Sequence, residues 1–222
     1  MQIDLKIAQL LSSRICHDLV GPIGAVNSGL ELISEVLDDD GAAMRLTTRS
    51  ADEASLRLAF YRAAFGHGSS TLAAAGWKLA LDEAGVLAEG LLKSSKVSLE
   101  WQEISSDVIG TVPPSAIKVI LNLVLIASES LPRGGIVCLS FAVLEEGFGV
   151  GLTFSGEGAA LREDLKCALK KNLEIAGDVL SARNIHAYLA QCLAYDLGAS
   201  IENSEGPKGE IQLAVLFPNA GY

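Results

Sequence analysis

The residue whose type and setting best suit chemistry is His17, in the stretch RICHDLVGP at residues 14–22. A neutral imidazole is a competent nucleophile near pH 7, and a phosphoryl group attached to it is labile enough to be passed on. Ile15 and Leu19 each lie two positions from His17, which on a helix is about 200° around the axis. We therefore expect the His17 side chain to point to solvent, away from the packed face.

The surroundings of His17 are low in relief. Its neighbours one turn away are Ser13 and Gly21, and the same side continues with the small residues Gly24, Ala25 and Ser28. Such a surface is open to another macromolecule and does not enclose a small substrate. Pro22 lies inside the same helical pattern and cannot donate to the carbonyl of Asp18, so a kink is expected there. Local rules broken together often mark a functional position.

Two helices must position this site. Apolar residues recur at steps of three and four from Ala8 to Leu37, a turn follows at residues 38–41, and the pattern resumes from Met44 to Phe65. A short turn makes the two helices antiparallel. Each keeps a broad apolar arc, so we infer that a second copy of the hairpin completes a dimeric four-helix bundle. The alternative is that the hairpin packs on the C-terminal part of the same chain.

Beyond a Gly/Ser-containing linker at residues 66–70, the pattern changes to α+β. Helices are expected at 79–92, 114–130, 160–173 and 182–197, and strands at 97–102, 136–144, 149–154, 200–203 and 210–217. Strands in antiparallel pairs with helices between them indicate a sheet with helices on one face. We divide the chain into a helical domain at 1–68 and an α/β sandwich domain at 69–222.

Composition narrows the class of protein. The net charge of −10 would repel a nucleic-acid backbone, so nucleic-acid binding is disfavoured. No run of eighteen apolar residues could span a membrane, and the first residues do not form a secretion signal. The four cysteines are scattered without metal-ligand spacing, which favours a reducing compartment and no metal site. We expect a cytoplasmic protein that binds neither membrane nor nucleic acid.

The stretch around His17 resembles the phosphoacceptor box of two-component histidine kinases, in which an acidic residue follows the histidine and a proline lies five positions after it. YRAAFG at 61–66 and LPRGG at 131–135 extend the similarity. Over essentially its full length, the chain resembles the ChpT family, the histidine phosphotransferases of alphaproteobacterial cell-cycle phosphorelays. The C-terminal half resembles the ATP-binding domain of the GHKL superfamily.

The GHKL motifs are damaged. In NLVLIA at 122–127, Ile126 replaces the asparagine that ligates magnesium in that superfamily, and isoleucine offers no oxygen to the cation. Phe154 stands where the resemblance implies an adenine-reading aspartate. Residues 181–184, SARN, lack the glycine of a phosphate lid. We therefore expect no bound ATP and no other cofactor.

The resemblance implies a homodimeric phosphotransferase that carries a phosphoryl group on His17 between the receiver of a hybrid histidine kinase and response regulators. The receiver would supply the phosphorylated aspartate, a magnesium ion and a lysine. Asp18 would accept a hydrogen bond from His17 and raise its basicity, as the acidic neighbour acts in related kinases. Ser13, Arg14, Gly21 and Pro22 would dock the receiver.

Several readings stay open. Arg14 could hold the transferring phosphoryl group or pair with an acid of the receiver, or it could be an ordinary solvated arginine. The chain could instead be an ATP-dependent sensor-kinase fragment or a non-catalytic dimeric scaffold. We interpret His67 as a solvated loop residue and His186 as a partly buried structural histidine. Trp77 and Trp101 are expected to pack in a core or an interface.

Overall fold

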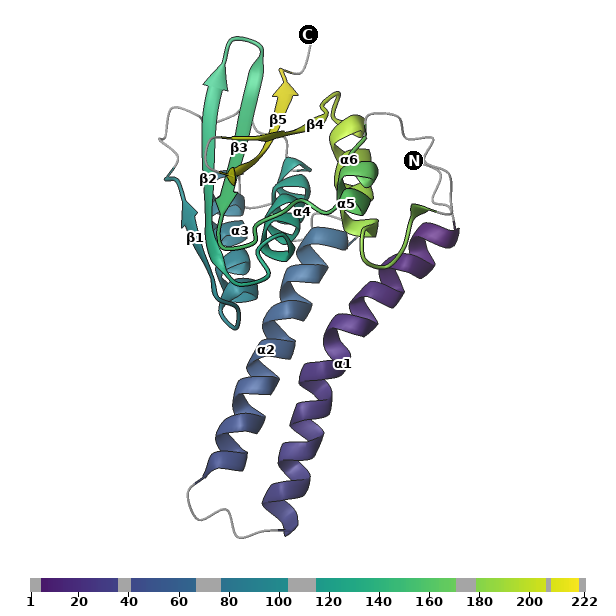
Figure 1. Cartoon of the computed structure of the whole chain (residues 1–222), viewed down its shortest axis with the longest axis vertical. Coiled ribbons are helices and arrows are strands. Elements are labelled where there is room, and N and C mark those ends of the chain that lie inside the picture. The colour runs from purple at the N-terminus through teal and green to yellow at the C-terminus, as the bar shows by residue number, and fades with distance from the viewer. Residues whose placement is uncertain are drawn as a thin grey trace.

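The protein folds as an antiparallel helical hairpin that projects from an α/β domain (Figure 1). The computed structural model describes residues 5–35, 41–66, 77–103, 115–170, 179–206 and 209–219. Helix α1 spans Leu5–Glu35 and helix α2 spans Ala42–Phe65. The predicted hairpin is thus confirmed. α1 is assigned as a single helix through Pro22, in spite of the missing backbone donor.

The two helices pack closely against each other at Gly29 of α1. Gly29 is buried, and a Cβ atom built there would overlap the Thr47 side chain of α2. The Thr47 hydroxyl donates to the Ala43 carbonyl at 2.8 Å, so rotating the Thr47 side chain away would break this hydrogen bond. By contrast, a Cβ at Gly24 of the same helix would meet no described atom within 4 Å.

This difference gives a stability prediction. Both Gly29→Ala and Gly24→Ala gain the helix propensity of alanine, about 1 kcal/mol. Only the Gly29 variant must also push Thr47 aside, an overpacking cost of about 1–3 kcal/mol. Denaturant unfolding at one fixed protein concentration should therefore find Gly29→Ala less stable than Gly24→Ala by that amount. Equal stabilities would mean that the helices do not meet at Gly29.

The second part of the chain is built on a mixed five-stranded sheet. Its elements are α3 (Trp77–Leu92), β1 (Val97–Trp101), α4 (Ala116–Glu129), β2 (Gly135–Leu144), β3 (Gly147–Ser155), α5 (Glu163–Ala168), α6 (Ile185–Asp196), β4 (Ile201–Glu205) and β5 (Ile211–Pro218). The strand order is β1-β2-β3-β5-β4. β1 runs parallel to β2, and the other pairs are antiparallel. The predicted α+β class is confirmed.

One predicted helix is much shorter in the structure. The sequence favoured helix over 160–173, but α5 covers only Glu163–Ala168, and Leu169 and Lys170 lie outside it. Residues 171–173 are outside the described residues. The backbone of Arg162, directly before α5, is extended (φ −58°, ψ 147°), and the Ala160 N–H donates to the Ser130 carbonyl at 3.1 Å, which ties the segment before the helix to the end of α4. α6 also begins three residues later than predicted, after a turn at 182–184.

The core lies between one face of the sheet and the helices. Alternate residues of β3, such as Phe148, Leu152 and Phe154, are buried, as strand geometry requires. α4 carries apolar residues around almost its whole circumference, which explains why eleven of its residues are buried. Phe60, Tyr61 and Ala64 near the end of α2 belong to the same buried cluster.

Among the described residues, the hairpin therefore packs on the C-terminal domain near the end of α2. Packing of the hairpin on the C-terminal part of the same chain is part of the alternative that the sequence left open.

Trp101 packs against the core as expected, whereas the Trp77 side chain, His67 and the boundary at 68/69 lie outside what the structure describes.

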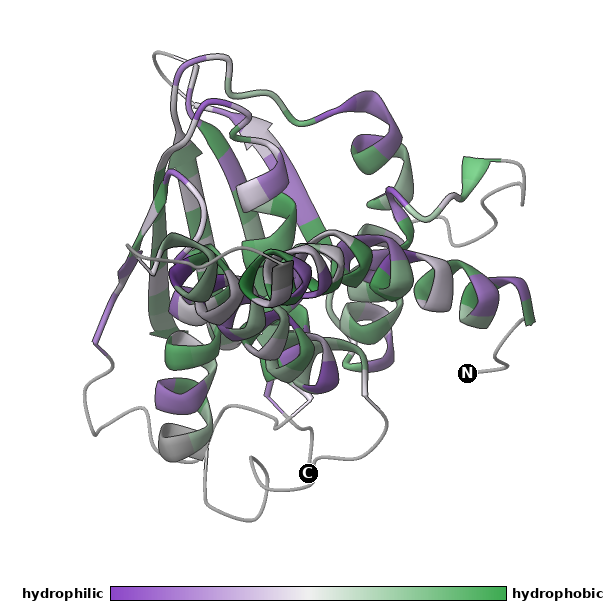
Figure 2. Ribbon diagram, turned by 90° about the horizontal axis from the view of Figure 1, so that it is seen from below, coloured by the Kyte–Doolittle hydropathy of each residue, from purple (hydrophilic) through white to green (hydrophobic). Residues whose placement is uncertain are grey.

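Figure 2 shows hydrophobic and hydrophilic residues interspersed along the ribbons. No helix in the described part of the chain combines the length and the apolar character needed to cross a lipid bilayer.

Candidate functional site

His17 projects from α1 into solvent. Its side chain is 83% exposed, which confirms the orientation predicted from the helical pattern. His17 Nδ1 lies 3.0 Å from Asp18 Oδ1. A carboxylate can only accept a hydrogen bond, so Nδ1 donates and carries the proton. In the neutral ring, Nε2 then keeps its lone pair and is the nitrogen available to react.

Asp18 is held by more than His17. Its Oδ2 accepts hydrogen bonds from the Tyr61 hydroxyl at 2.5 Å and from Arg14 Nε at 2.7 Å. Burial by itself would raise the pKa of Asp18, but the hydrogen bonds from His17 and Tyr61 and the charge of Arg14 outweigh it and lower the pKa. Asp18 is therefore a carboxylate at neutral pH. Burial, together with Asp18, raises the pKa of Tyr61 to about 12, so Tyr61 keeps its proton and donates.

Arg14 corrects the sequence interpretation. It was expected to reach a docking partner or the phosphoryl group, but the residue is only 7% exposed. Besides Asp18, its guanidinium contacts Glu129 of α4, the Ala182 carbonyl at 3.4 Å and His186 Nδ1 of α6 at 3.1 Å. The physical reason is charge pairing, because a guanidinium tolerates burial when acids satisfy its donors.

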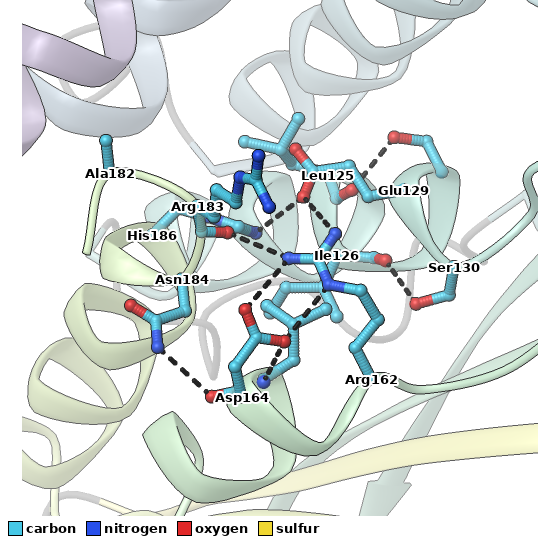
Figure 3. Close-up of polar contacts among 12 residues, drawn as sticks. Leu125, Ile126, Glu129, Ser130, Arg162, Asp164, Ala182, Arg183, Asn184 and His186 are labelled. Atoms are coloured by element: carbon cyan, nitrogen blue, oxygen red, sulfur yellow. Dashed lines mark hydrogen bonds and ion pairs between the residues drawn. The ribbon is translucent and has the colours of Figure 1, made fainter. Parts of the chain in front are cut away.

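His186 is also more deeply buried than predicted. The residue is 0% exposed, and its Nδ1 faces a guanidinium, which can only donate. The ring is therefore neutral with its proton on Nε2, which lies 3.5 Å from Glu129 Oε2. Figure 3 shows Glu129, Arg162 and His186 gathered in the space between α4, α5 and α6.

The positions at which the GHKL resemblance implies metal- and adenine-binding residues are filled with core residues. Ile126 is 0% exposed and Phe154 is 1% exposed, so both belong to the hydrophobic core. In the segment where the resemblance would place a phosphate lid, the Asn184 side chain accepts from the Ser181 N–H at 2.8 Å and donates to the Val179 carbonyl at 2.9 Å. These bonds fold the segment onto its own turn.

Comparison with known proteins decides the family. A family model described as histidine phosphotransferase C-terminal domain matches residues 81–208. The chain is 34% identical over 199 residues to protein phosphotransferase ChpT of Brucella abortus strain 2308, a match that covers 89% of each chain. The chain belongs to the ChpT family of histidine phosphotransferases. The family predicted from the sequence is confirmed, and this ChpT-family protein is a phosphotransferase of the phosphorelay type.

Solved structures agree with this assignment. A bacterial phosphotransferase determined at 1.7 Å superposes with a TM-score of 0.78 at 27% identity, over 97% of this chain and 98% of that one. The nucleotide-free catalytic domain of histidine kinase ThkA superposes with a TM-score of 0.50 at 15% identity, over 64% of this chain and 92% of that one. The matched 64% of the ChpT-family protein thus has the fold of a histidine-kinase catalytic domain.

The other docking residues predicted for this ChpT-family protein lie near His17 on α1. Ser13 and Gly21 are exposed, and Pro22 is half-buried. A Cβ at Gly21 would meet no described atom within 4 Å, so the surface beside His17 has the low relief that the small residues predicted.

Two residues of the site were not predicted. Tyr61 was expected only as an apolar residue of the second helix and as part of a family phrase, and Glu129 was not singled out. Tyr61 lies 43 residues from Asp18, and Glu129 lies 115 residues from Arg14. No spacing rule links residues so far apart. Only the packing of α2 and α4 against α1 brings them together.

Burial of His186 has a measurable consequence. Burial, reinforced by the charges of Arg14 and Arg162, lowers the pKa of His186 well below 6.5. Below that pH the unfolded chain takes up a proton that the folded chain refuses, so stability falls as the pH falls. The free energy of unfolding should drop by roughly 1 kcal/mol between about pH 7.5 and 5.5. His186→Gln, whatever its own stability, should lack this drop, and denaturant titrations at the two pH values would test it. An equal drop in both proteins would place a proton on the folded His186.

Proposed function

We propose that His17 is the phosphoacceptor, and that the chain carries a phosphoryl group between the aspartates of a hybrid-kinase receiver and of response regulators. The observation that carries this proposal is an 83% exposed imidazole whose Nδ1 is held at 3.0 Å by the Asp18 carboxylate. Such a ring presents a free Nε2 lone pair to a visiting protein.

The chemistry follows from this arrangement. The Nε2 lone pair attacks the phosphorus of an aspartyl phosphate, and the bond from phosphorus to the aspartyl oxygen breaks with its electrons left on the receiver's carboxylate. The ring becomes more positive during the attack, and the Asp18 carboxylate on the Nδ1 proton offsets that charge. In-line placement and charge neutralisation are the main requirements of phosphoryl transfer. The receiver would bring magnesium and a lysine for the phosphoryl oxygens.

We assign receiver docking to the surface around Ser13, Gly21 and Pro22. Two of these residues are exposed, and their small side chains let a partner approach His17 closely. Arg14 does not belong to this surface, because its donors are used inside the chain. The four cysteines are free, which is compatible with the reducing cytoplasm that we propose as the location.

We propose a homodimer as the functional assembly. Apolar residues of the hairpin are 45% to 68% exposed: Val20, Ile23, Leu30, Leu32, Met44, Leu46 and Leu58. Several belong to the predicted seams of the two helices, and a second hairpin would bury them in a four-helix bundle. Light scattering in solution should give twice the chain mass of 23.2 kDa, and a value near the single mass would contradict the dimer.

We also propose that the chain works without ATP. Ile126 and Phe154 fill the expected metal and adenine positions with buried hydrocarbon. Calorimetric titration with ATP and magnesium should show no binding. Micromolar affinity would favour the sensor-kinase alternative.

The deciding experiment supplies the protein with phosphate directly. A receiver domain charged with radiolabelled acetyl phosphate is purified and mixed with the full chain. We expect label on the chain that is lost in acid and stable in base, as phosphohistidine is, and that maps to the peptide containing His17. Label on another peptide would contradict the proposal. So would the absence of label on the chain after mixing with each charged receiver domain that is active in transfer.

A further inference from the structure

The Asp18 carboxylate stands between His17 and a group of buried donors. Oδ1 faces His17 Nδ1, whereas Oδ2 accepts from Tyr61 and from Arg14 Nε. The Asp18 side chain is 14% exposed, so water competes little for these oxygens. The direction of the carboxylate plane, and with it the bond to His17, therefore depends on where the Arg14 guanidinium lies.

The guanidinium is in turn placed by the C-terminal domain. Arg14 donates through Nη2 to Glu129 Oε1 of α4, and through Nη1 towards His186 Nδ1 of α6. Glu129 Oε2 lies 3.9 Å from Arg162 Nη1, and Figure 3 shows the two side chains directed towards each other. Glu129 is thus the acid of the C-terminal domain to which Arg14 donates, and it is itself fixed from the far side.

We propose that Glu129 is a positioning residue for His17: it holds the Arg14 guanidinium, which orients the Asp18 carboxylate that keeps the His17 proton on Nδ1. This inference rests on the proposed role of His17 as phosphoacceptor. By this inference the C-terminal domain, in which core residues fill the nucleotide positions, takes part in the transfer reaction. The C-terminal domain acts on the exposed ring from behind, across the interface between α1, α4 and α6.

The geometry favours this role over simple adhesion of the two domains. Arg14 offers two nitrogens of one planar group to two acids, Nε to Asp18 and Nη2 to Glu129. Because the group is planar and rigid, a bond at one nitrogen restricts the direction of the bond at the other. Without the charge of Glu129, the buried guanidinium keeps a single strong anionic partner and shifts towards it, which changes the angle at which Asp18 meets His17.

The test uses Glu129→Gln in the full chain, with two readouts. The first is the tautomer of His17 from ¹⁵N chemical shifts: the proton is on Nδ1 in the wild type, and we expect a mixture of both tautomers in the variant. The second is the initial rate of phosphoryl acceptance from the charged receiver domain. We expect a loss of about tenfold, the size typical when an outer partner that orients an imidazole is removed.

A matched control separates charge from position. Glu157→Gln removes the same charge from the same domain, where Glu157 pairs with Arg133 on the surface. It should keep the wild-type tautomer and rate. If Glu129→Gln does not fold, Arg14→Met combined with Glu129→Leu replaces the buried pair with apolar side chains of similar size, a change that such sites tolerate. Asp18 then keeps Tyr61 but loses Arg14, and the same two effects are expected.

Wild-type tautomer and rate in whichever folded variant is tested would overturn the inference. Loss of stability alone, with both readouts unchanged, would also overturn it, because it would show adhesion only. The two proposals fail separately. If wild-type His17 accepted no label, the phosphoacceptor role would fall, while the tautomer would still report whether Glu129 positions the ring.

Discussion

Replacing His17 with alanine should abolish phosphoryl acceptance from a charged receiver domain, with a rate at least about 10³-fold below that of the wild type. Removal of a nucleophile costs this much because the remaining groups can only bind and orient the partner. The His17 side chain is 83% exposed, so the substitution should change stability by no more than about 0.5 kcal/mol. Quench-flow measurement of label transfer, with circular dichroism to verify folding, would check both parts.

The neighbouring Cys16 provides the control. It is exposed on the same helix and is itself a potential nucleophile, but it takes no part in the hydrogen bonds around Asp18 that the structure describes. Cys16→Ala should therefore accept label at the wild-type rate. If His17→Ala kept the native rate, phosphate would travel by another residue, or the protein would serve as a scaffold for transfer between other proteins.

Replacing Asp18 with asparagine should lower the acceptance rate by about 10²-fold, within the range for losing a group that assists a proton-bearing nucleophile. The amide has nearly the same shape and can still accept from Tyr61. It carries no charge to offset the positive charge that develops on His17, and it leaves Arg14 with a weaker partner. Rapid-quench kinetics at a saturating concentration of the receiver domain would separate the chemical step from docking.

The pH dependence of stability follows from the same residue. Because the folded-state pKa of Asp18 is lowered from 3.8, its contribution to stability is complete above that pH and is lost as the pH falls through the folded value. Asp18→Asn should lack this part of the loss of stability in acid, whereas Glu31→Gln, at an exposed position of α1, should retain it.

For the kinetic prediction, a wild-type transfer rate in Asp18→Asn would show that the carboxylate does not assist His17.

The sequence by itself determined the parts of this protein that depend on local periodicity and residue chemistry. The spacing of Ile15 and Leu19 predicted an outward His17, because a helix repeats every 3.6 residues whatever packs against it. Alternating apolar residues predicted the strands. These two inferences compare a residue with its near neighbours, whereas the interpretation of Ile126 and Phe154 as lost nucleotide-binding positions came from the resemblance to the GHKL superfamily.

Only the tertiary structure decided what lies behind the exposed ring. A charged residue such as Arg14 is read from sequence as solvated, because charges are seldom buried without partners. Its partners Glu129 and His186 follow 115 and 172 residues later, and no periodic pattern spans such separations. The same limit applies at Ala160, whose N–H pairs with the carbonyl of the distant Ser130 in a segment whose own residues favour helix. The burial of Arg14 and the pairing of Ala160 both depend on partners that only the folded chain brings within hydrogen-bonding distance.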